Sequence, residues 1–278
     1  MIRERVAEDV YLFTSEVYAK VNAGAIVGSD WSVMIDTLAY PDETLEIRDF
    51  LEKRIHKPVR YLVNTHYHAD HSLGNSWFPD AVIVGHQRCR ELLDTLGRTA
   101  LENAQQQSKE LEDVRIVLPD AVFDRGGISI RVGKRTLRLV FLPGHSPDGI
   151  GVLIEEDRVL FSGDVMMPIP YIVDGDFETM IESLNKIPAM KLENLIQGHG
   201  EVVLRGEVRS KIDDNIDYLE QLRRHVRKAS RRREPEEYLR SIDVESCGKS
   251  RILLNGLAEE LHTRNLLALY HKWYGGDR

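Results

Sequence analysis

Four side chains of the types that bind metal ions stand close together in this sequence. His66, His68, Asp70 and His71 all lie in the stretch THYHADH, at residues 65–71. This stretch begins at the end of the apolar run VRYLVNT at residues 59–65, which is typical of a buried strand. In extended backbone, residues 66 and 68 point to the same side, so their imidazoles could share one cation. Asp70 and His71 follow where the chain must turn, and they could face a second point nearby.

Two metal ions need more ligands than one loop supplies. Three further candidates each follow a strand-like run and a glycine: His145 in FLPGHSPDG, Asp164 in VLFSGDVMM and His199 in LIQGHGE. Glycine permits the close backbone approach that such a position requires. Among the remaining histidines, His86 also ends a strand and is only a weak candidate ligand, and His56, His225, His262 and His271 are expected to be exposed or helix-face residues.

The elements around these residues alternate as in a layered α/β fold. Strand patterns cover 10–15, 21–27, 31–37, 59–65 and 81–86, with helical patterns after residue 41, after residue 86 and over 98–110. Closely spaced strands over 114–163 predict an antiparallel half, followed by a helix at 177–188 and a short strand near 195. Helical patterns then continue to about residue 273. We therefore expect a catalytic domain over 1–204 and a C-terminal helical extension over 205–278 packed on it.

Composition narrows the functional classes. The net charge of −8 argues against a general nucleic-acid binder and against adhesion to an anionic membrane. No apolar run approaches the length of a membrane span, and the N-terminal MIRERVAEDV lacks the apolar core of a signal peptide, so a cytoplasmic protein is expected. Cys89 and Cys247 are far apart in sequence and are expected to be buried, reduced thiols.

The seven candidate ligands together resemble those of the metallo-β-lactamase-fold hydrolases. HYHADH matches the H-x-H-x-D-H motif of that superfamily in full, and the later His, Asp and His match His145, Asp164 and His199 in order. The resemblance covers about residues 5–205 and implies a four-layer αββα sandwich with the site at the edge between its two sheets. It also implies a ligand set for two metals: His66, His68 and His145 for the first, Asp70, His71 and His199 for the second, and Asp164 as the bridge.

A histidine-rich, carboxylate-bridged site suits zinc, so two Zn²⁺ per chain are expected, with iron or manganese as alternatives. Two metals about 3.5 Å apart can share a water and lower its pKa toward neutrality, which gives a bridging hydroxide as nucleophile. In this scheme Asp70 has a catalytic role as well as a ligand role, because it orients the nucleophile and shuttles protons.

Further residues are predicted to support the ligands or the substrate. Asp36 could accept a hydrogen bond from a ligand histidine, and Thr65 and Ser146 adjoin ligands; ordinary turn capping is the alternative for all three. The proline-broken apolar stretch MMPIPYIVDGD suits a loop that lines a substrate cleft. Within it Met167 and Tyr171 are predicted to contact substrate, with Tyr171 as an oxyanion contact.

The branches of the superfamily differ at positions that this sequence shows. Glyoxalase II shares the full ligand set, but its basic glutathione-binding ending is not evident in LHTRNLLALYHKWYGGDR. β-Lactamases generally lack the bridging aspartate, and quorum-quenching lactonases carry tyrosine where this chain has Met167. The predicted function is hydrolysis of an ester, thioester or lactone-type bond in a small molecule.

Two rival functions stay open for the same fold: a phosphodiesterase or nuclease, and an iron-dependent oxidoreductase similar to persulfide dioxygenases. An inert binding protein is a further alternative, against which the complete ligand set counts. The C-terminal helices could form a lid, a homodimer contact or a cover for the core.

Overall fold

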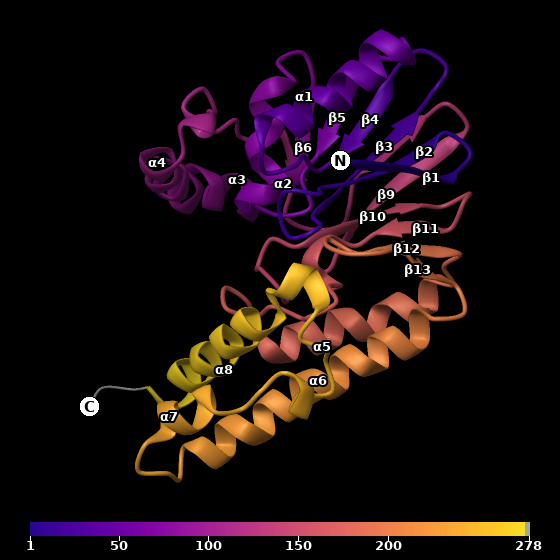
Figure 1. Cartoon of the computed structure of the whole chain (residues 1–278). Coiled ribbons are helices and arrows are strands. Elements are labelled where there is room, and N and C mark those ends of the chain that lie inside the picture. The colour runs from indigo at the N-terminus through magenta and orange to yellow at the C-terminus, as the bar shows by residue number, and fades with distance from the viewer. Residues whose placement is uncertain (276–278) are drawn as a thin grey trace.

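The computed structural model describes residues 1–275 and contains two β-sheets packed face to face (Figure 1). The first sheet has seven strands in chain order. β1 to β4 are antiparallel, whereas β4 to β7 pair in parallel. The strands are β1 (Ile2–Ala7), β2 (Val10–Thr14), β3 (Asn22–Val27), β4 (Ser32–Ile35), β5 (Val59–Val63), β6 (Val82–His86) and β7 (Ala121–Phe123).

The second sheet has six strands in the order β13-β12-β11-β10-β9-β8. Its pairs are antiparallel except for β11 and β12, which run in parallel. The strands are β8 (Ser129–Val132), β9 (Arg135–Phe141), β10 (Ile150–Ile154), β11 (Val159–Phe161), β12 (Asn194–Ile196) and β13 (Val203–Leu204).

Helices cover the outer face of each sheet. The larger helices are α1 (Pro41–Asp49), α3 (Gln87–Leu92), α4 (Arg98–Gln107), α5 (Phe177–Lys186), α6 (Val208–Ala229), α7 (Pro235–Arg240) and α8 (Ala258–Tyr274), and α2 (Ala69–Ser72) is a single turn. Alternate residues of a strand point to opposite faces. Thus Val63 lies between the sheets and Leu62 faces α1, while Val152 lies between the sheets and Leu153 packs in the cluster formed with α5, α6 and α8. The fold is the expected αββα sandwich with C-terminal helices.

Several elements differ from the sequence-based prediction. β1 was not expected, because its charged residues occupy an exposed edge strand with little apolar pattern. Ala121–Phe123 joins the first sheet in parallel with β6 rather than the antiparallel half. The last helix begins at Ala258, because Leu254 and Asn255 adopt left-handed backbone angles just before it.

Two further residue-level predictions can be compared with the structure. Both cysteines are free and buried, as expected. His262 was expected to be an exposed or helix-face residue, and it lies on α8 but is fully buried, with its Nδ1 3.1 Å from the Tyr218 hydroxyl. A helix long and apolar enough to cross a membrane does not occur within residues 1–275.

Candidate metal centre

The candidate ligands lie at one edge of the two sheets because the strands that carry them end there. His66 follows β5, Asp164 follows β11 and His199 follows β12, which is parallel to β11. β9 and β11 both pair antiparallel with β10, so β9 runs in the same direction as β11 and brings His145 to this edge. Strands that run in the same direction end at the same edge of a sheet, so residues distant in sequence come to lie next to one another there.

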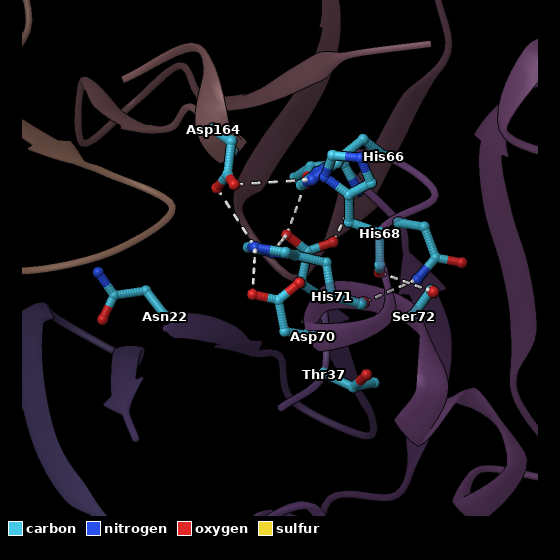
Figure 2. Close-up of polar contacts among 12 residues, drawn as sticks. Asn22, Thr37, His66, His68, Asp70, His71, Ser72 and Asp164 are labelled. Carbon is cyan, nitrogen blue, oxygen red and sulfur yellow. Dashed lines mark hydrogen bonds and ion pairs between the residues drawn. The ribbon is translucent and has the colours of Figure 1, made fainter. Parts of the chain in front are cut away.

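The seven predicted ligands form two adjoining clusters whose ligand atoms lie within 4.8 Å of one another in each. The first contains His66, His68, His145 and Asp164, and the second contains Asp70, His71 and His199. Asp164 faces both clusters (Figure 2). Its Oδ1 lies 3.2 Å from His71 Nε2, and its Oδ2 lies 3.4 Å from the Nε2 atoms of both His145 and His199.

A buried carboxylate holds the base of the histidine loop. Asp36 accepts hydrogen bonds from the Thr65 backbone N–H and hydroxyl, both at 2.6 Å, and its Oδ2 lies 3.0 Å from His71 Nδ1. The predicted contact between Asp36 and a candidate ligand histidine is present. Thr65 Oγ1 also lies 3.0 Å from His66 Nδ1. The Ser146 hydroxyl lies instead beside Asp148, where burial raises the pKa of the carboxyl and the hydroxyl only partly opposes that shift. Such partners fix the tautomer and orientation of a metal-binding imidazole.

Two residues that support candidate ligands were missed by sequence reasoning. Asn22, on β3, donates from Nδ2 to the carbonyls of Gln197 and Gly200, on either side of His199. Asp174 lies with Oδ2 3.2 Å from Nε2 of His68. The partners are 175 and 106 residues apart in sequence. No local sequence pattern could identify such contacts.

Helix α8 supports the centre through a loop. The Nδ2 atom of Asn265 donates to the Pro170 carbonyl at 2.7 Å, and its Oδ1 accepts from the Ile172 N–H at 3.0 Å. Between them, the Tyr171 carbonyl lies 2.6 Å from His145 Nδ1. Asn265 is fully buried, so α8 fixes the loop that orients a candidate ligand.

Burial and nearby charges shift the pKa values of the candidate ligands in opposite directions. Burial lowers the pKa of His145 to about 4 and holds that of His66 well below its ordinary value. Burial also disfavours the charged form of His199, but the Asp164 and Asp70 carboxylates outweigh it and raise the pKa to about 10. In return the pKa of Asp70 falls to about 2, because His71 and His199 outweigh the effect of burial.

These observations fit a metal site. His66 Nε2 is buried and has no hydrogen-bond partner among the described residues, and it points into the first cluster. A buried, unpaired imidazole nitrogen is costly unless a ligand satisfies it. Imidazole and carboxylate donors are the set that zinc, iron and manganese prefer.

The clusters open into a cleft of about 560 Å³. Met167 and Tyr171, the two predicted substrate residues, both line it, as do Tyr18 and Arg264. Asp70 and burial raise the pKa of the Tyr18 hydroxyl to about 12, so this group stays protonated at neutral pH. Arg264 lies on α8 near Tyr171, and sequence reasoning missed it. The C-terminal helices therefore form part of the cleft as well as of the core.

Comparisons with known proteins place these residues in a wider context. A family model described as "Metallo-beta-lactamase superfamily" matches residues 19–206. A Caenorhabditis elegans beta-lactamase-like protein 2 homolog is 27% identical over 186 residues, covering 67% of this chain and 56% of the relative. The human acyl-coenzyme A thioesterase MBLAC2 is 27% identical over 206 residues, covering 65% of this chain and 73% of the relative. This chain spans about half the length of several curated relatives that it matches.

A solved structure resembles the whole described fold. The sec-alkylsulfatase Pisa1 from Pseudomonas sp. superposes with a TM-score of 0.75 and 18% sequence identity. The match covers 99% of this chain and 50% of that protein. The likeness therefore extends over the C-terminal helices and concerns the fold alone.

Gly198 gives a direct test of the position of Asp164. A Cβ atom at residue 198 would lie 1.7 Å from Asp164 Oδ1, so Gly198→Ala must displace the carboxylate. We expect metal affinity to fall by at least about tenfold, since displaced ligands and their supports have effects of that size. Gly206→Ala is the matched control, because nothing lies within 4 Å of its Cβ. Equal zinc affinity of the two variants in a chelator competition would contradict this geometry.

The raised pKa values of His71 and His199 predict that metal uptake releases protons. Both imidazoles are protonated near pH 7.5 in the metal-free protein, and a metal ligand must be neutral. We expect about two protons released per chain and an apparent zinc affinity that increases with pH. Titration calorimetry in two buffers with different ionisation enthalpies measures the release. An apparent binding enthalpy that is the same in both buffers would exclude it.

Proposed function

Because the chain belongs to the metallo-β-lactamase superfamily, we propose that it is a metal-dependent hydrolase that cleaves an ester, thioester or lactone-type bond in a small molecule. The observation that carries this proposal is Asp164, whose carboxylate lies between two histidine clusters at the end of an open cleft. The similarity to a human acyl-coenzyme A thioesterase supports hydrolysis of an acyl bond.

Each of the two clusters is proposed to bind one metal ion, and Asp164 is proposed to contact both ions. We assign His66, His68 and His145 to one metal, Asp70, His71 and His199 to the other, and Asp164 to both. Zinc is the proposed metal, because imidazole and carboxylate donors suit it and hydrolysis needs no redox change. When bound, the pair would supply Lewis acidity and lower the pKa of water.

The residues of the chain then have separate tasks. Asp70 is a carboxylate at neutral pH, because its pKa is about 2, so it can accept a hydrogen bond from the attacking water and orient it. Tyr18 and Tyr171 line the cleft beside the candidate ligands, and a phenol hydroxyl there can donate to a developing oxyanion. Asp36, Asp174 and the Tyr171 carbonyl hold the ligand imidazoles in place.

The proposal is tested by measuring bound metal and then assaying a substrate panel. The purified protein is expected to contain about two zinc ions per chain and to hydrolyse at least one of the esters, thioesters and lactones. Phosphodiesters are included as the competing class, and oxygen consumption with iron-loaded protein tests the redox alternative. Zinc binding without hydrolysis of any acyl substrate would refute the proposal.

Asp164→Ala should abolish metal binding and turnover together, because one side chain contacts both clusters. We expect a loss of at least about 100-fold in kcat/KM together with a reduced zinc content. Asp213→Ala is the control, since Asp213 lies on the exposed side of α6 and pairs only with Arg209 among the described residues. Full metal content and normal turnover of Asp164→Ala would show that the shared-ligand assignment is wrong.

A further inference from the structure

The cleft has an apolar half that the metal chemistry does not use. One wall consists of Leu93 and Leu96 in the helical turn before α4, Ala100 on α4, and Ile116. A second wall consists of Leu254, Leu257 and Leu261, from the turn before α8 and from α8 itself. The two walls are more than 130 residues apart in sequence and lie on the same cleft as the candidate ligands.

Part of this apolar surface is open to solvent. Leu96 is 54% exposed, and Leu257 and Leu261 are only half-buried. Apolar side chains that converge on a cleft without covering one another are typical of a binding surface. The residues of both walls are apolar, whereas Asp70, Asp164, His145 and His199 gather at the metal end of the cleft.

Helix α8 contributes both apolar and charged side chains to the lining of the cleft. Leu257, Leu261 and Arg264 follow the spacing that places residues on one face of a helix. Arg264 lies near Tyr171, beside the candidate ligands. It is the only arginine or lysine among the described residues that line the cleft. A substrate in this cleft therefore meets polar groups beside the metal end and leucine side chains beyond them.

We propose that the apolar half of the cleft binds an aliphatic acyl group of the substrate, so that the enzyme prefers longer acyl chains over acetyl or butanoyl groups. This inference rests on the proposed acyl hydrolysis. The acyl carbonyl lies at the metal end, and the hydrocarbon chain lies between the leucine walls. Each methylene removed from water then contributes about 0.8 kcal/mol, or roughly a fourfold increase in kcat/KM.

The test is the chain-length dependence of hydrolysis of acyl N-acetylcysteamine thioesters, from butanoyl to decanoyl. Wild-type protein is expected to gain roughly fourfold in kcat/KM per methylene until the walls are filled. Leu96→Asn and Leu257→Asn are expected to lose most of that gain. Leu204→Asn is the matched control, because Leu204 is 57% exposed on β13 and does not line the cleft, and it should keep the wild-type dependence.

A binding measurement separates failure of this inference from failure of the proposed function. Octanoate is expected to bind at least about tenfold more tightly than butanoate in titration calorimetry, and Leu257→Asn should remove the difference. Thioester hydrolysis without chain-length dependence would overturn the acyl site while the hydrolase proposal stands. Selective octanoate binding without hydrolysis of any acyl substrate would support the apolar site and refute the hydrolase proposal. Equal binding of the two carboxylates would overturn the acyl site.

Discussion

The structure depends on a buried carboxylate that needs partners from both sheets. Asp164 is only 5% exposed, and removing a carboxylate from water is costly unless donors or cations surround it. His71 comes from the first sheet's edge, and His145 and His199 come from the second. The side chains packed between the sheets therefore have a chemical role, because they fix the distance at which these edges meet.

The C-terminal helices are part of the same constraint. Asn265 binds the two backbone groups that flank Tyr171, and the Tyr171 carbonyl in turn orients His145. Arg264, on the same helix, faces the cleft. A single helix thus contributes to the position of a candidate ligand and to the lining of the cleft. The fold likeness to a solved structure also extends over these helices.

The resemblance of the HYHADH motif to a known family predicted the αββα fold. All seven candidate ligands could be found from the sequence, because four of them stand in one short stretch after an apolar strand and the other three, His145, Asp164 and His199, each follow a strand and a glycine. The sequence could not predict Asn22, Asp174 or Asn265, whose partners are distant in sequence and leave no local pattern. It also placed Ala121–Phe123 in the wrong half, since strand propensity does not specify which sheet a short strand joins. The apolar wall on α8 was hidden for a related reason, because its leucines share a helix with core leucines.

The bond between Asn265 and Pro170 has a consequence for synthesis on the ribosome. Its two residues are 95 positions apart, so at ordinary rates of translation roughly 5–20 s pass between their appearance. During that interval both sheets can form, while the loop that orients His145 still lacks its partner. The nascent chain would therefore pass through a period in which the scaffold is complete and one histidine of the first cluster is not yet fixed. A metal ion captured then would meet a looser and less selective set of ligands than the finished protein presents.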